Sequence, residues 1–186
     1  MRDINKTIED IEASALKAEA AFQLWWGINH DGKNDHLDVM NNSKHVDFFH
    51  AVIPLLLQGI LINLSRVFDR ASDLSGIKSL KDDLATIGKH EAVTDIDKVL
   101  KNHVSTVKSI KGIRDQSVAH SKHAKSVDQI YQENPITPDQ MKELISIIKE
   151  VVEIASKSVG RNSNILLSQR YLDATLNLLG NLRAKT

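Results

Sequence analysis

The chain has 186 residues, with 41% hydrophobic and 26% charged residues, an ordinary globular composition that excludes wholesale disorder. The 24 Lys and Arg residues balance the 24 Asp and Glu residues in number, so the net charge is zero. This argues against a protein that coats polyanions through its overall charge, although it does not exclude a local basic patch. With no cysteine, the chain has no disulfides, thiolate metal sites or cysteine nucleophiles.

The chain shows no targeting signal or membrane span that sequence patterns would reveal. Its first residues, Met1 to Lys6, are polar and lack the apolar core of a signal peptide. The longest apolar stretch, Ala51 to Leu64, is interrupted by proline, glycine and amide residues and is too short to cross a bilayer, so we expect a buried helix there. We therefore expect a cytoplasmic protein with one domain over residues 1–186 and no membrane contact.

The first half of the chain predicts two long helices. Apolar residues from Ile4 to Trp25 follow one face of a first helix, and residues 27–42 are rich in Asn, Asp and Gly, as in a loop. A second helix has Leu57, Leu61, Leu64 and Phe68 on one face. Pro54 marks either a kink in this helix or its start.

The second half predicts helices as well. Ser79 is expected to cap a short third helix that ends near Gly88, and a fourth helix is expected from about Ala92 to the neighbourhood of His120. The segment from Thr137 to Gln140 is a capping box that starts a fifth helix, which stops at Gly160. A sixth helix uses Leu167, Tyr171, Ala174 and Leu178 on one face. The sequence thus predicts an all-α bundle of about five to six helices.

The usual enzyme motifs are absent. The chain has no phosphate-binding glycine loop, no HExxH zinc motif and no GxSxG nucleophile elbow. Two histidine groups invite a metal interpretation, namely His45 with Asp47 and His50, and His120 with His123. Each supplies too few ligands for a zinc site, so we expect neither a metal nor a cofactor.

Positive charge is concentrated in one segment. Residues 98–125 contain seven basic residues and one acidic residue, a net +6, against 17 and 23 elsewhere, a net −6. Such a segment favours a phosphate-bearing partner, because fixed cations release counterions from a polyanion. The alternative is a solvated lysine face balanced by acidic neighbours in space, and charge alone does not separate the two.

An arginine occupies an apolar position of the fourth predicted helix. Val93, Leu100 and Val107 are spaced by seven residues, and the next step is Arg114. Burying an isolated guanidinium is costly, so either the apolar stripe has ended or the arginine faces a polar cleft. His120 lies six residues later, about 120° around a straight helix, so the two side chains meet only if the helix ends or bends, or if a second subunit contributes.

The segment Arg114-Asp-Gln-Ser-Val-Ala-His120 resembles the Arg-x4–6-His motif of HEPN domains. The stretch from Leu61 to Asp69, followed by Ser79-Leu-Lys-Asp-Asp-Leu, is similar to the AbiU2-like branch, which is associated with phage abortive infection. The resemblance implies a helical bundle that dimerises with the motifs facing each other and often acts as a metal-independent ribonuclease. It also implies an RNA partner and, in a toxin–antitoxin system, a cognate antitoxin protein; DNA is not expected.

The residue types suit RNA cleavage without a metal. His120 has a reference pKa near 6.5 and can transfer protons near neutral pH, while Arg114 offers a charged fork that matches phosphate oxygens. Asp115 either orients one of these two residues or offsets charge. Four further residues are candidates for holding the RNA backbone: Lys108, Lys111, Lys122 and His123.

Two alternatives stay open. On the first, Arg114 pairs with an acid such as Asp69 or Asp173 and closes one end of the bundle, while His120 caps its own helix. On the second, the protein is a helical binding module, for a nucleotide, RNA or a protein, that performs no chemistry.

Overall fold

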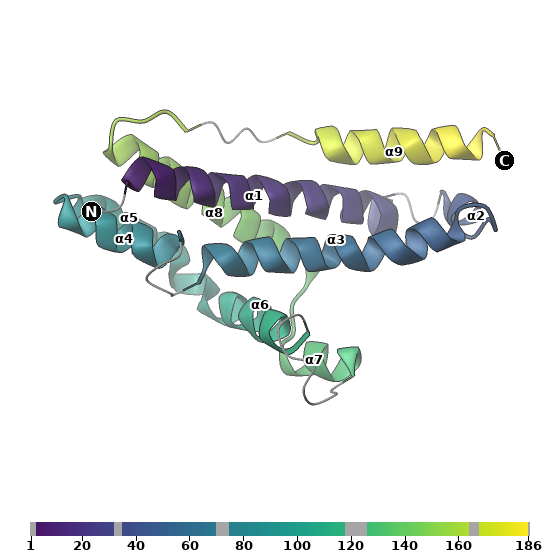
Figure 1. The fold of residues 1–186 in the computed structure, drawn as a ribbon, viewed down its shortest axis with the longest axis horizontal. Coiled ribbons are helices and arrows are strands. Elements are labelled where there is room, and N and C mark those ends of the chain that lie inside the picture. Colours follow the sequence, from purple (N-terminus) through teal and green to yellow (C-terminus); the bar gives the residue numbers. More distant parts are fainter. Residues whose placement is uncertain (1–2, 32–34, 70–74, 118–125, 164–167, 186) are drawn as a thin grey trace. The chain divides into compact units, whose positions relative to one another are not determined.

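A computed structural model of the chain describes residues 3–31, 35–69, 75–117, 126–163 and 168–185. Within these residues all regular secondary structure is helical (Figure 1). This confirms the predicted all-α fold class.

The helices follow one another with short connections. In chain order they are α1 (Ile4–Trp26), the π-helical turn η1 (Gly27–Asp31), α2 (Leu37–Met40), α3 (Val46–Val67), α4 (Ile77–Thr86), α5 (His90–Leu100), the 3-10 turn η2 (Lys101–His103), α6 (Val104–Ser117), α7 (Val127–Glu133), α8 (Pro138–Ser158) and α9 (Arg170–Arg183).

The chain divides into two compact units. The first unit comprises Met1–Ala18 and Leu61–Ile165, and the second comprises Glu19–Ile60 and Leu166–Thr186. Two of the boundaries fall inside α1 and α3, so each of these helices contributes residues to both units. The expectation of one domain over residues 1–186 stays a prediction.

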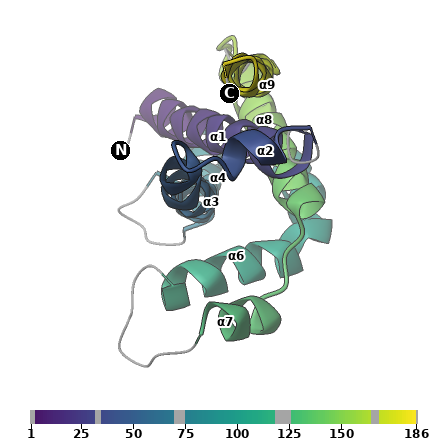
Figure 2. The ribbon, with the colours of Figure 1, turned by 90° about the vertical axis from the view of Figure 1, so that its right-hand side faces the viewer.

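The first unit has an aliphatic core. Helix α5 packs against α4 and α8, and α6 lies beside α7 (Figure 2). Its fully buried side chains include Ile8, Ile11, Leu64, Leu80, Leu84, Ile96, Ile110, Ile113, Leu144 and Ile148. The start of α8 follows the sequence prediction, because the Thr137 hydroxyl accepts a hydrogen bond from the Gln140 amide at 3.2 Å and the Gln140 side chain accepts one from the Thr137 amide at 2.9 Å.

Two helix predictions in the first unit were wrong in detail. The predicted fourth helix is broken into α5 and α6 by η2, so the heptad spacing before Arg114 does not run along one continuous helix. Ser79 does not precede α4 but lies within its first turn, where its hydroxyl accepts a hydrogen bond from the Gly76 amide at 3.0 Å. Gly76 itself occupies the cap position in extended backbone.

The second unit is held by a smaller apolar cluster. Its buried members are Ile28, Val39, Phe49 and Leu179. The predicted loop at residues 27–42 therefore contains structure, namely η1 and α2, and both contact α9. The side chain of Gln23 accepts a hydrogen bond from the Tyr171 amide at 3.2 Å, which satisfies one free N–H group at the start of α9.

Helix α3 is longer and more exposed than the sequence predicted. It begins at Val46 and continues through Pro54, so this proline does not mark its start. By length and composition α3 is apolar enough to cross a membrane, because an 18-residue stretch of it has a mean hydropathy of 1.7, and only 28% of that stretch is buried. Length and composition of this kind also occur in the core helices of soluble proteins, and the absence of membrane contact stays a prediction.

Candidate nucleic-acid interface

Arg114 lies in the last turn of α6 and is held by two carboxylates. Its Nη1 group donates to Oδ2 of Asp69 at 3.0 Å, and its Nε and Nη2 groups donate to Oδ1 of Asp115 at 2.8 and 2.6 Å. Asp69 follows the end of α3, so the contact connects two elements of the first unit that are far apart in sequence. Of the alternatives that the sequence left open, pairing with Asp69 and orientation of Arg114 by Asp115 are the arrangements observed.

The electrostatics of this cluster keep the guanidinium charged. Partial burial works to lower the pKa of Arg114, but the hydrogen bonds and charges of Asp115 and Asp69 outweigh it and raise the pKa above its ordinary value. A guanidinium has five N–H donors, and three of those of Arg114 bond to acceptors among the residues that the structure describes. The cluster has a formal charge of −1, which limits its attraction for a polyanion.

The packing of α6 explains why an arginine occurs there. Ile110 and Ile113 are fully buried, and Arg114 follows on the edge of that buried face with 26% of its side chain exposed. The apolar stripe therefore ends at Ile113, and the arginine is placed where two carboxylates compensate its partial burial.

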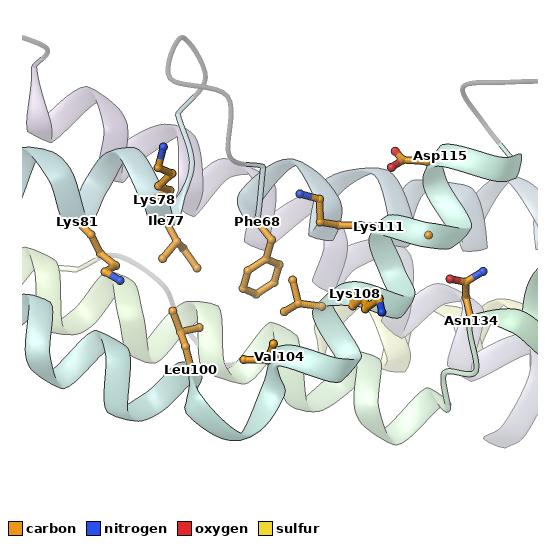
Figure 3. Close-up of a pocket in the computed structure, with 12 residues that line it drawn as sticks. Phe68, Ile77, Lys78, Lys81, Leu100, Val104, Lys108, Lys111, Asp115 and Asn134 are labelled. Carbon is orange, nitrogen blue, oxygen red and sulfur yellow. The ribbon is translucent and has the colours of Figure 1, made fainter.

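A pocket of about 790 Å³ lies along α6 beside this cluster (Figure 3). Four lysines line it: Lys78, Lys81, Lys108 and Lys111. The first two come from α4 and the last two from α6, and Figure 3 shows them on opposite sides of Phe68. The structure thus brings Lys108 and Lys111 together with two cations outside the basic segment that the sequence singled out.

The lysines of the pocket differ in their partners. Lys81 forms an ion pair with Asp97. Among the described residues, Lys78, Lys108 and Lys111 form no ion pair. Within the described part of the chain, an anionic ligand would therefore reach these three cations without breaking an ion pair.

The floor of the pocket is apolar. It is formed by Phe68, Ile77, Leu100, Val104 and Val107. Val104 is 65% exposed, although most of the other large apolar residues of the first unit are buried. Asp115 and Asn134 line the end of the pocket nearest the arginine cluster, so Asp115 belongs to both features.

Sequence reasoning missed helix α7, which is followed by the pocket residue Asn134. Gly112 in α6 lets α7 approach, because a Cβ atom at this position would lie 1.8 Å from Oδ1 of Asn134, the residue that follows α7. The signal for α7 was present in the sequence, since Ser126 and Gln129 form a capping box at its start. Phe68 and Lys81 lie in the two segments that resemble the AbiU2-like branch, but neither these residues nor Lys78 was predicted as a site residue, and all three were found from their positions around the pocket.

Part of the predicted site lies outside the described residues. This applies to His120, Lys122 and His123. The geometry between Arg114 and His120 therefore stays a prediction. As for metals, the described part of the chain contains no cluster of three or more His, Asp or Glu side chains that would hold an ion.

A comparison with known protein families identifies a match over most of the chain. The family described as AbiU2, a group of HEPN domains, matches residues 5–175 of the chain. No curated protein and no solved structure matches significantly. The match spans the arginine cluster, the lysine-lined pocket and the whole basic segment.

Proposed function

Because this chain belongs to the AbiU2 family of HEPN domains, we propose that it is a metal-independent endoribonuclease of an abortive-infection or toxin–antitoxin type system. The observation that supports the proposal most directly is the arginine at the end of α6, whose guanidinium is held in a fixed orientation by Asp69 and Asp115. Beside it, Lys108 and Lys111 offer charge to an RNA backbone.

The chemistry assigns a role to each residue. His120 takes the proton of the ribose 2′-hydroxyl or gives one to the leaving oxygen, because its reference pKa near 6.5 permits both at neutral pH. Arg114 stabilises the charge that develops on the phosphate, and Asp115 orients Arg114. Lys108, Lys111, Lys122 and His123 hold the RNA.

The active form in this proposal is a homodimer. One chain supplies one Arg114 and one His120, and a twofold axis would place two of each in one cleft. Light scattering at micromolar concentration should give about twice the chain mass of 20.8 kDa. A monomer at every accessible concentration would contradict the shared cleft. A cognate antitoxin protein is a further proposed partner.

The test of the reaction is cleavage of single-stranded RNA in EDTA. The products should end in 2′,3′-cyclic phosphate, because the adjacent hydroxyl is the nucleophile. DNA, and RNA with a 2′-deoxy group at the scissile nucleotide, should resist. A requirement for a divalent metal would contradict the proposal.

The variant that tests the role of His120 in this reaction is His120→Ala. Its cleavage rate should fall by about 10²–10⁴-fold, the usual contribution of one general acid–base group. Circular dichroism and the oligomeric mass should stay unchanged, so that the loss is not due to unfolding. A folded variant that cleaves at the original rate would remove His120 from the mechanism.

A second candidate function is a non-catalytic helical binding module. The observation that favours it is the charge of the arginine cluster, where two carboxylates outnumber one guanidinium. Such a module would bind RNA with the pocket lysines and leave it intact. Binding without cleavage, under conditions where the chain is folded and dimeric, would support this function instead.

A further inference from the structure

The pocket along α6 combines lysines, which can contact a phosphate backbone, with an apolar floor. A chain of phosphates would use the lysines and leave the apolar floor facing water. The floor includes Val104, which is 65% exposed, next to the half-buried Val107. An exposed apolar patch bordered by cations fits a ligand that has both an apolar surface and an anionic group.

The size of the pocket limits that ligand. Its volume of about 790 Å³ lies within the usual range of small-molecule sites, roughly 300–1,000 Å³. A single nucleotide combines a flat base, which aliphatic side chains can cover, with a phosphate that lysines can bind. Figure 3 shows Val104 close to Phe68, between the lysines of α4 and those of α6.

The end of the pocket beside Arg114 offers hydrogen-bond acceptors. Asp115 uses only Oδ1 to bind Arg114, and 52% of its side chain is exposed. The amide nitrogen of Asn134 donates to the Ile130 carbonyl at 3.0 Å, so this nitrogen is already engaged. Acceptors favour a ligand that presents donors, and the exocyclic amino groups of cytosine, adenine and guanine are such donors, whereas uracil presents a carbonyl at the corresponding position.

We propose that this pocket binds one nucleotide, with its base on the apolar floor and its phosphate at the lysines, and that it prefers a base with an exocyclic amino group over uracil. The proposal rests on the proposed function for the source of the nucleotide, an unpaired residue of the RNA substrate. A free mononucleotide has the same chemistry, so the experiment includes both.

The first arm compares cytosine with uracil, because the two bases have the same ring size and differ in the amino or carbonyl group at one position. Calorimetry measures binding of CMP and UMP to the full chain, and fluorescence anisotropy measures labelled octacytidine and octauridine RNA. We expect the cytidine ligands to bind about tenfold more tightly, the effect of one hydrogen bond to a charged acceptor. Preference for octacytidine without detectable CMP binding assigns the pocket to RNA, and preference in both pairs assigns it to either source.

The second arm places a carboxylate on the pocket floor. Val104→Asp should weaken binding of octacytidine at least tenfold, because the new charge repels phosphate and occupies the apolar surface. The matched control is Ser105→Asp, an exposed neighbour in the same turn of α6 that does not line the pocket. It makes the same charge change and should alter affinity less than about twofold. Thermal melts of both variants check folding.

The two proposals fail in different ways. If RNA is not cleaved in EDTA but the cytidine preference and the weaker binding of Val104→Asp are present, the endoribonuclease proposal is wrong and the pocket stands. If RNA is cleaved while cytidine and uridine ligands bind alike, or while the Val104→Asp and Ser105→Asp variants behave alike, the pocket proposal is overturned and the endoribonuclease proposal stands.

Discussion

Arg114, at the end of α6, and Lys108 and Lys111, earlier in the same helix, carry positive charge under opposite conditions. The guanidinium is fixed by three hydrogen bonds to Asp69 and Asp115, and the two carboxylates outnumber it. The two lysines border an open pocket and form no ion pair among the described residues. One region has defined geometry and little net attraction for a polyanion, and the other has attraction without a fixed geometry.

Under the proposed function, the arginine and the lysines would have different roles. A fixed fork can align with phosphate oxygens at a reacting centre, since little further ordering is needed. Unpaired lysines attract the backbone through counterion release, which depends on charge number more than on orientation. Exchanging the cation types, or removing them, therefore tests each region separately.

The largest effect is expected from exchanging Arg114 for lysine. Arg114→Lys keeps the charge but loses the planar fork whose three nitrogens bond Asp69 and Asp115, so the cleavage rate should fall on the order of 100-fold. The matched exchange is Lys111→Arg in the pocket, which should change the rate less than about threefold, because only charge matters there. Single-turnover kinetics in EDTA measure both. Equal effects of the two exchanges would mean that the geometry of the arginine is not used.

The second largest effect is expected in the salt dependence of RNA binding. The double variant Lys108→Ala, Lys111→Ala should weaken RNA binding and flatten the dependence of log affinity on log salt, by roughly one unit of slope for each phosphate that is no longer neutralised. The control is Lys6→Ala with Lys98→Ala, which removes two lysines that are paired with Asp10 and Asp95 away from the pocket. Its slope should stay near that of the unchanged chain. An unchanged slope in the pocket variant would identify a solvated lysine face.

The sequence predicted the parts of this comparison that depend on local patterns. The helical period, the capping box at Thr137 and the glycine stop at Gly160 each act within a few residues, and the structure confirms α8 between them. The basic segment and the arginine at an apolar heptad position could also be identified from the sequence. Pairing of Arg114 with an acid such as Asp69 or Asp173 was an alternative that the sequence left open, and the structure shows the bond to Asp69.

The parts that the sequence did not predict depend on distant contacts. No glycine or proline marks the break at η2, and once α5 and α6 are separate, a heptad count across them loses its meaning. The pocket joins α4 to α6, so its lysines are 27–33 residues apart and share no motif. Charge counted along the chain also did not show which cations are already paired. Only tertiary structure separates Arg114 from Lys108.

A smaller effect is expected from Asp69→Asn, which lowers the negative charge around Arg114 while keeping an acceptor for Nη1. The formal charge of the cluster changes from −1 to 0, so RNA affinity at low salt should rise about two- to threefold, while the rate should fall by a similar factor because the fork is held less firmly. The control is Glu153→Gln, the same charge change at an exposed position of α8. Tighter binding in both variants would reflect net charge alone and not the arginine cluster.

The smallest effect separates stability from both charged regions and concerns Asp10. Its carboxylate accepts hydrogen bonds from Lys6 at 3.0 Å and from Ser75 at 2.8 Å, and the contact with Lys6 lowers the pKa of Asp10 despite the opposing effect of burial. A lowered folded-state pKa stabilises the native chain above the unfolded value of about 3.9, and this contribution disappears as the pH falls through the folded value.

Asp10→Asn should therefore lower the free energy of unfolding at pH 7 by less than about 1 kcal/mol, since solvent screens the exposed lysine, and the difference should shrink toward zero near pH 2. Urea unfolding at the two pH values measures this, with Glu9→Gln, an exposed neighbour, as the control that should show no such change. Cleavage by the Asp10→Asn variant at pH 7 should equal that of the unchanged chain. A decrease in stability that is the same at both pH values would mean that the carboxylate charge does not contribute, and that the asparagine disturbs the packing of α1 instead.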